Sequence, residues 1–347
     1  TNSRRETAFA FYSIHLFIAH YIVMKKYDSM LPLDVSTSAS LETLPCCLAC
    51  GGHSFETVQR TRAMMHPSEE SFNFDECQDC GLVQLNPRVR ASELMHYYTD
   101  YYLPYRGEHA WGKYATLVKN SQIKMDRQRV KRVQQFVPLN SSTKLVDIGC
   151  GKPTFLEQAQ RLTGCHALGL DFNDSGWRDE PQRFAALQLQ VGEVGNLMLD
   201  TADVFTMWHY LEHDYAPMDT LRQLRQYAQA DTHLIVEVPN YDSDSRRRFG
   251  TNWAGWHSPR HTALYTPKSM TVLLERSGWQ VKQTLSYGTL DPYNLYWMSR
   301  MEQRGIDWSQ DMEQEFWGYV RGMVAFLPKR WLGSSLGVMT AIATPRK

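Results

Sequence analysis

The chain has 347 residues, of which 43% are hydrophobic, so it can form one large domain and a smaller one and is not disordered throughout. Lysine and arginine together number 37, as do aspartate and glutamate, so no overall charge would draw the protein to nucleic acid or to an anionic membrane. This balance disfavours an RNA substrate.

The first 44 residues are expected to form an extension and a linker. Residues 8–24 are apolar and are flanked by basic pairs, which admits a membrane or signal-peptide interpretation. The run is shorter than the roughly 20 residues of a spanning helix, contains His15 and His20, and lacks a clear cleavage site. We therefore expect a cytoplasmic protein without a transmembrane segment. An amphipathic or docking helix that contacts a membrane peripherally is the intermediate possibility.

Two cysteine pairs follow, Cys47-x2-Cys50 and Cys77-x2-Cys80, with 26 residues between them. Each pair is followed by glycine, which permits the tight turn that directs backbone N–H groups at sulfur. Thiolates two residues apart can bind one tetrahedral Zn²⁺, and a site with four sulfur ligands is structural because it has no open position. Two disulfides in a secreted protein are the alternative, which the absence of a convincing export signal disfavours. The spacing predicts a zinc-ribbon-like module over residues 45–105.

Two further segments precede the large domain's first strand. Tyrosines crowd residues 97–102, where their phenols could cover a substrate or join the small module to the large domain; both roles remain open. Residues 111–136 have helical periodicity and a basic face. Such a face is commonly only solvated, and contact with RNA is the alternative.

Residues 145–155 read Leu-Val-Asp-Ile-Gly-Cys-Gly-Lys-Pro-Thr-Phe and join an apolar strand to a glycine turn and a helix start near Pro153. Gly149 and Gly151 let the backbone turn sharply and approach a ligand. A second strand, residues 166–171, ends in Asp171. An acid about 20 residues past the glycines can accept hydrogen bonds from both hydroxyls of a ribose. The pattern therefore predicts a nucleoside cofactor.

From residue 144 onward, strands and helices alternate. This predicts an α/β fold over residues 106–347, doubly wound and Rossmann-like, with a seven-stranded, mostly parallel sheet. In such sheets ligands bind beyond the carboxyl ends of the strands, where the strand order reverses. We expect strands near 144–149, 166–171, 187–192, 203–208, 233–238, 279–287 and 337–344, and helices near 154–163, 217–229 and 267–277.

Several of these segments resemble one enzyme family. Val-Asp-Ile-Gly-Cys-Gly at residues 146–151 resembles the first motif of class I S-adenosylmethionine-dependent methyltransferases. Residues 203–213 and 235–240 resemble the family's fourth and fifth strands. Residues 253–266, which include Pro-Arg-His, resemble a segment of the subgroup that carries an N-terminal four-cysteine zinc module. The resemblance covers most of the chain and implies S-adenosylmethionine as cofactor and Zn²⁺ as a structural ion.

The resemblance also implies a role for residues at the strand ends. Those expected to contact the cofactor are Asp147, Gly149, Gly151, Asp171, Glu193 and Trp208. The first three would surround the methionine part, Asp171 the ribose and Glu193 the adenine amine, while Trp208 and His209 would flank the sulfonium. Pro153 stands where the family has its third glycine and cannot donate a hydrogen bond.

His261 is the predicted general base, with His209 as the second candidate, because histidine can deprotonate a hydroxyl or an acidic carbon near neutral pH. The alternative for His261 is a hydrogen-bonding brace between loop and sheet. Residues 239–265 are expected to be loop-like. Their arginines, at 246–248 and 260, could bind a phosphate or carboxylate of the substrate or remain solvated.

Residues 209–213 also spell H-x-x-E-H, the inverted zinc-protease pattern. That pattern requires a helix through His209, whereas residues 204–208 are strand-like, so a protease is disfavoured. Two alternatives remain for Glu212 and His213. They could hold a divalent ion near the substrate, as in some quinone-type O-methyltransferases that the segment resembles, or they could brace the loop.

The predicted reaction is in-line transfer of a methyl group to carbon or oxygen of a small-molecule, sugar or lipid-type acceptor. The resemblance points in part to sugar C-methyltransferases and in part to quinone-type O-methyltransferases. One competing class is an RNA methyltransferase that uses the zinc module for RNA contact, although no Asn-Pro-Pro-aromatic motif follows the fourth strand. Another is a non-enzymatic scaffold that binds the cofactor. The sequence defines neither the acceptor nor the oligomeric state.

Overall fold

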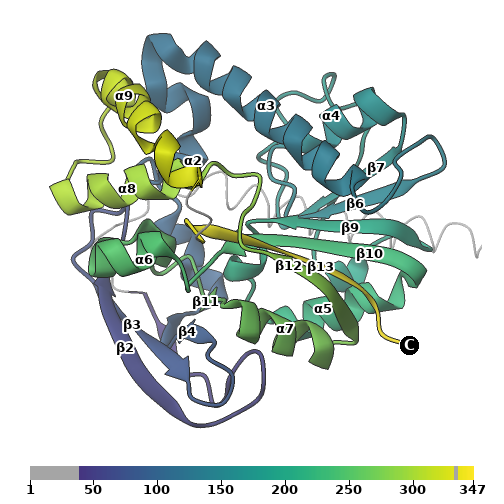
Figure 1. The fold of residues 1–347 in the computed structure, drawn as a ribbon, viewed down its shortest axis with the longest axis horizontal. Helices are drawn as coiled ribbons and strands as arrows, with labels where there is room; N and C mark the ends of the chain where they lie inside the picture. The colour runs from purple at the N-terminus through teal and green to yellow at the C-terminus, as the bar shows by residue number, and fades with distance from the viewer. Residues whose placement is uncertain (1–38, 332–334) are drawn as a thin grey trace, which may run out of the picture. The chain divides into compact units, whose positions relative to one another are not determined.

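A seven-stranded sheet lies at the centre of the computed structural model, which describes residues 39–331 and 335–347 (Figure 1). Of the extension expected over residues 1–44, only residues 39–44 are among the described residues. The strands of the sheet are β6 (Lys144–Ile148), β7 (His166–Asp171), β8 (Gln188–Val191), β9 (Ala202–Trp208), β10 (Ala228–Pro239), β12 (Trp279–Leu285) and β13 (Val338–Pro345).

The strand order is β12-β13-β10-β9-β6-β7-β8. Strands β6 to β10 pair in parallel, whereas β13 runs antiparallel to both β10 and β12. From β6 the chain moves outward to β7 and β8 and then returns to place β9 on the other side of β6. The order therefore reverses between β6 and β9, which confirms the predicted doubly wound, mostly parallel architecture and marks the expected ligand crevice.

Helices cover both faces of this sheet. Figure 1 shows α3 (Ala115–Gln134) and α4 (Thr154–Thr163) over one face, with α5 (Pro217–Gln226) and α7 (Pro267–Arg276) over the other. Successive residues of β6 serve the two layers, because Leu145 packs with the α3 and α4 side chains and Val146 with those of α5 and α7. This alternation with a period of two explains why β6 carries apolar side chains for both layers.

The helices of the sheet layers begin where the sequence predicts. A capping box between Thr266 and Ser269, with Pro267 in the first turn, starts α7. Gly164, in the left-handed conformation at φ +73°, ends α4. Helix α5 ends at Gln226, three residues earlier than predicted, because β10 already begins at Ala228, which pairs with Ala202 of β9.

A second, four-stranded sheet is formed mainly by strands of the cysteine module. Its order is β11-β4-β3-β2, formed by β2 (Phe55–Arg62), β3 (Ser71–Cys77), β4 (Val83–Leu85) and β11 (Ala263–Leu264). The last of these strands comes from far along the chain, directly after Pro259-Arg260-His261, and pairs antiparallel with β4. The module is thus joined by backbone hydrogen bonds to the loop that carries the predicted base.

Other helices and strands connect these layers. They are β1 (Leu41–Glu42), β5 (Arg88–Val89), α2 (Leu103–Arg106), α6 (Asp244–Phe249), α8 (Pro292–Arg304) and α9 (Phe316–Phe326), with 3-10 turns that include η2 (Gly107–Tyr114) and η4 (Leu211–His213). The prediction of a loop over residues 239–265 was wrong in part, since it contains α6 and β11. The helix predicted from residue 111 starts as the 3-10 turn η2, because Gly112 has non-helical backbone angles.

No helix among the described residues is both long and apolar enough to cross a membrane.

Candidate active site

The glycine turn after β6 lies at the point where the strand order reverses. Gly149 has a φ of +70°, and a Cβ there would lie 2.2 Å from the Tyr210 ring, so both the turn and the close packing require glycine. Gly151 has a φ of +50°, and an added Cβ there would meet no described atom within 4 Å. Its N–H donates to Asp171 Oδ2 at 2.8 Å. The end of β7 thus closes the turn with a carboxylate.

Asp147 lies inside β6, on the strand next to the one that carries Asp171. Its side chain is 4% exposed and accepts a hydrogen bond from Thr206 Oγ1 of β9 at 2.6 Å. Burial raises the pKa of Asp147 to about 7, and burial also raises the pKa of Asp171. Because the two strands are parallel neighbours, the two carboxyl groups belong to the same region of the sheet, as the cofactor prediction requires.

The other two predicted cofactor residues have different surroundings. Trp208, at the end of β9, packs edge-on against Phe155, and its ring lies 5.2 Å from the Arg129 guanidinium of α3. Glu193 follows β8, is exposed, and precedes a short 3-10 turn. Trp208 is thus the last residue of its strand, and Glu193 lies just beyond the carboxyl end of β8.

His209, the first residue after β9, lies between two buried carboxylates. Its Nδ1 is 3.2 Å from Glu212 Oε1, and its Nε2 is 3.3 Å from Glu237 Oε1. Burial by itself would lower the pKa of His209, but the two carboxylates raise it to about 9. The side chain is 21% exposed, and the backbone has a φ of +58°, which is unusual for a residue other than glycine. The His209 backbone is therefore strained, directly after the end of β9.

Glu237, near the carboxyl end of β10, is a site residue that the sequence analysis did not identify. It is fully buried and accepts hydrogen bonds from the backbone N–H groups of Thr289 at 2.7 Å and Leu290 at 3.0 Å. Burial opposes its ionisation, yet His209 and these donors lower its pKa to about 2. The available signal was a glutamate inside the apolar run Ile-Val-Glu-Val, since an acid in a central strand needs buried partners.

His261 is 3% exposed and lies deeper than His209. Its Nδ1 is 2.8 Å from the carbonyl oxygen of Gly255, and its ring meets the His213 ring nearly at a right angle, with centroids 4.5 Å apart. Burial, and to a smaller extent the neighbouring His213, holds the pKa of His261 well below its usual value, so the ring is neutral. The hydrogen bond to Gly255 braces His261 within its own loop.

Arg260 is fully buried, so the expectation that it could bind a substrate anion is wrong. Its guanidinium donates to the carbonyl oxygens of Tyr97 and Met64 and stacks 4.1 Å from the centroid of the Tyr102 ring. All three partners precede α3 in the chain, on the side of the cysteine module. Arg260 therefore fastens the histidine loop to that part of the chain.

The tyrosine segment joins the two parts of the protein and also reaches the histidines. The hydroxyl of Tyr98 is 3.4 Å from His213 Nδ1, and Tyr97 donates to Glu70 at 2.7 Å. Of the two roles considered for the tyrosines, these contacts support the joining role directly, and Tyr98 lies next to the site.

The four cysteines meet as the spacing predicts. Cys47 and Cys80 have sulfurs 3.5 Å apart, as do Cys50 and Cys77, and all four sulfurs lie within 4.8 Å of one another. Disulfide sulfurs would be about 2.05 Å apart, so the disulfide alternative is wrong. Zn–S bonds of about 2.3 Å in a tetrahedron separate sulfurs by about 3.8 Å, close to the observed spacing. Backbone N–H groups of Ala49 and Gly52 point at two of the sulfurs.

The middle of the chain matches a known family. Residues 121–284 match the family model described as "Methyltransferase domain", a span that holds the glycine turn, Asp171, His209 and His261. This part of the chain is therefore similar to methyltransferase domains. No curated protein matches the chain in sequence.

Solved structures of methyltransferases are similar to this chain at low sequence identity. One is the methyltransferase of Geobacter sulfurreducens in complex with S-adenosyl-L-homocysteine, at 16% identity and a TM-score of 0.39, with 63% of this chain and 91% of that chain covered. Another is the magnesium protoporphyrin IX methyltransferase of Synechocystis, at 10% identity and a TM-score of 0.43, with coverage of 70% and 93%. Neither likeness defines an acceptor.

The H-x-x-E-H segment of the chain does not form the helix that a protease would need. Strand β9 ends at Trp208, and the turn η4 begins only at Leu211. His209 therefore belongs to the strand end and His213 to the turn. The two histidines do not share the face of one α-helix.

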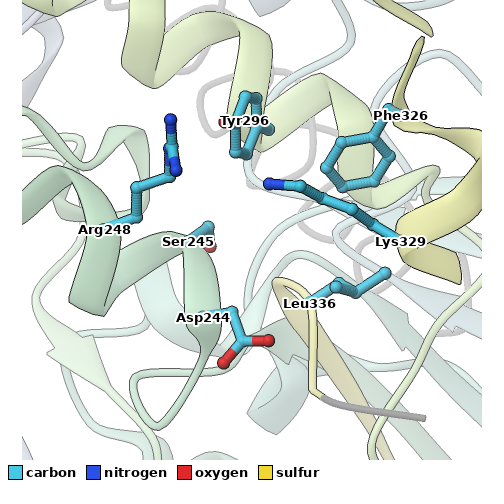
Figure 2. Close-up of a pocket in the computed structure, with 7 residues that line it drawn as sticks. All are labelled: Asp244, Ser245, Arg248, Tyr296, Phe326, Lys329 and Leu336. Carbon is cyan, nitrogen blue, oxygen red and sulfur yellow. The ribbon is translucent and has the colours of Figure 1, made fainter. Parts of the chain in front are cut away.

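A pocket of about 230 Å³ lies beside α6 and α8. Figure 2 shows Lys329 pointing toward Tyr296, and Arg248 on the other side of that ring. Among the arginines considered as anion ligands, Arg248 lines this pocket, whereas Arg247 pairs with Asp242 at 2.6 Å. The lining residues are Asp244, Ser245, Arg248, Tyr296, Phe326, Lys329 and Leu336.

Proposed function

We propose that the chain is an S-adenosylmethionine-dependent methyltransferase that acts on a small-molecule, sugar or lipid-type acceptor. The observation that carries the proposal is the hydrogen bond from the Gly151 N–H to Asp171, at the edge of the sheet where the strand order reverses. It places a glycine turn and a carboxylate side by side at the position where doubly wound sheets bind nucleosides.

The proposed cofactor contacts follow from this arrangement. Asp171 has lone pairs beyond those used by the Gly151 and Asn173 N–H groups, and these would accept the ribose hydroxyls. The open space around Gly151 would admit the methionine part, with Asp147 behind it. When bound, the sulfonium supplies the methyl group as an electrophile. The protein's contribution is to align the acceptor, which is worth up to about 7–11 kcal/mol in favourable model reactions.

His209 is the proposed contact to the acceptor. It follows β9, one of the two strands between which the order reverses, and of the two predicted catalytic histidines it has the more exposed ring. Glu212 and Glu237 hold the ring from two sides, which fixes its orientation without help from the acceptor. The general-base role of His261 stays a prediction. Its burial places it behind the residues that an acceptor would meet first.

The cysteine cluster is the proposed structural Zn²⁺ site of a module over residues 45–105. Four sulfurs and no open position suit an ion that holds a fold rather than one that reacts. The support is the donor set and the N–H groups aimed at sulfur. The proposed role of the module is to position the tyrosine segment and, through β4 and β11, the histidine loop. The methyltransferase domain would then occupy residues 106–347.

The proposed cofactor can be tested by calorimetric binding of S-adenosylmethionine and S-adenosylhomocysteine. We expect Asp171→Ala to weaken binding about 10- to 100-fold, because hydrogen bonds to a charged group contribute roughly 1.5–3 kcal/mol. Asp179→Ala is the matched control, since that side chain is 88% exposed, and it should bind like the wild type. A wild-type protein with no affinity for either compound would overturn the proposal.

The acceptor can be tested by transfer of a labelled methyl group to nucleotide sugars, quinones, lipids and RNA. Transfer to one of the first three classes is expected. Transfer to RNA, with binding that weakens steeply as salt is added, would favour the RNA methyltransferase instead. A cytoplasmic location also stays a prediction.

A further inference from the structure

Three potential metal ligands meet beside His209 and away from the cysteines. Glu212, His213 and His261 each offer one ligand atom, and these atoms all lie within 4.8 Å of one another. Glu212 and His213 belong to η4, immediately after β9, whereas His261 precedes β11. The cluster is therefore created by the fold, which brings together residues 48 positions apart.

Each of the two histidine rings has its Nδ1 held by a backbone carbonyl oxygen. His213 Nδ1 lies 3.1 Å from the Arg260 carbonyl oxygen, and His261 Nδ1 lies 2.8 Å from the Gly255 carbonyl oxygen. A carbonyl oxygen only accepts, so each Nδ1 carries the proton and each Nε2 carries a lone pair. Metal-binding histidines in proteins commonly donate their other N–H to a carbonyl in this way.

Glu212 supplies the negative charge and an unused oxygen. Its side chain is 1% exposed, and Oε1 is engaged by His209. Its Oε2 is buried and has no hydrogen-bond partner among the described residues. A buried carboxylate oxygen without a partner is costly, and a bound cation would remove that cost.

We propose that Glu212, His213 and His261 bind a divalent transition-metal ion, in a second metal site distinct from the four cysteines. Two imidazole nitrogens and one carboxylate oxygen suit Zn²⁺, Fe²⁺ or Mn²⁺, whereas Mg²⁺ and Ca²⁺ prefer sets of oxygen ligands. Three protein ligands leave coordination positions open. One of these could take an oxygen atom of the acceptor, a role that rests on the proposed methyltransferase function.

Metal content of the full-length protein tests this site. The protein is stripped with a chelator, equilibrated separately with Zn²⁺, Fe²⁺ or Mn²⁺, and analysed by mass spectrometry for bound metal. We expect two equivalents of Zn²⁺ per wild-type chain and one for Glu212→Gln, His213→Gln or His261→Gln. Glu302→Gln is the matched control: Glu302 is also a glutamate with a buried oxygen that has no partner among the described residues, but it lies outside the triad, so two equivalents should remain.

Wild-type protein that takes up only one equivalent of Zn²⁺ and none of the other two ions would overturn the proposal. So would full retention of both equivalents by Glu212→Gln. Should the variants fail to fold, anomalous X-ray scattering from wild-type crystals soaked in Zn²⁺ decides, because the proposal requires a peak about 2.0–2.2 Å from both histidines and the carboxylate. A peak at the cysteines alone contradicts it.

Failure of this proposal is distinguishable from failure of the proposed function. Glu212→Gln should lose one metal ion while keeping its affinity for S-adenosylhomocysteine. Asp171→Ala should lose that affinity and keep both metal ions.

Discussion

Replacing Glu237 with glutamine should destabilise the protein strongly. The carboxylate is fully buried, accepts two backbone N–H groups from the segment after β12, and lies 3.3 Å from His209. Glutamine keeps one acceptor oxygen, but its amide N–H₂ group would face a backbone N–H donor. Gly288 leaves little room for the amide to move, since even a Cβ there would lie 2.6 Å from the Glu237 carboxyl carbon.

The expected cost of Glu237→Gln is about 4 kcal/mol of unfolding free energy, since removing one partner of a buried ion pair costs roughly 3–5 kcal/mol. Urea denaturation followed by tryptophan fluorescence measures it. Glu56→Gln, which removes the same charge from an exposed position of β2, should change the unfolding free energy by less than about 0.5 kcal/mol.

A double-mutant cycle separates the ion pair from the backbone hydrogen bonds. His209→Gln combined with Glu237→Gln should cost less than the sum of the single changes by about 1–3 kcal/mol, because the two side chains are in contact. Strict additivity, or a cost of Glu237→Gln below about 1 kcal/mol, would show that the carboxylate does not hold His209 and the loop as described.

Two further predictions concern the cysteine cluster and Asp147. Cys77→Ser should lose the cysteine-bound Zn²⁺ and lower the melting temperature, whereas Cys46→Ser, outside the cluster, should change neither; metal analysis and calorimetry check this. Because the folded-state pKa of Asp147 is raised to about 7, the folded protein holds a proton between about pH 4 and pH 7 that the unfolded chain has lost, so this group's contribution to stability falls as pH rises. Asp147→Asn removes this pH dependence. Urea denaturation should therefore show the unfolding free energy of the variant, relative to that of the wild type, rising by about 2 kcal/mol from pH 5 to pH 7, because one pH unit is worth about 1.4 kcal/mol. A constant difference across this range would contradict a buried, protonated Asp147.

The sequence by itself determined the central sheet and the glycine turn that follows β6. Strands buried on both faces are mostly apolar, and proline and glycine bound the helix that follows β6, so β6, β7 and the start of α4 can be located from local pattern alone. The Gly149 turn and Asp171 can be located for the same reason, since both stand at the ends of these strands. The cysteine pairs are also local, because two residues of spacing suffice to direct both sulfurs at one ion.

Only the tertiary structure decided which side chains are buried together. Arginine is a residue type that commonly binds anions. The three partners of Arg260 lie more than 150 residues away in sequence, so no local pattern reveals that its side chain is buried and joins two parts of the chain. Glu237 becomes a site residue because β10 pairs beside β9, which carries His209 next to it. The union of His261 with Glu212 and His213 likewise depends on β11 joining the small sheet. Burial and charge pairing are properties of long-range packing, and the sequence specifies them only through the fold as a whole.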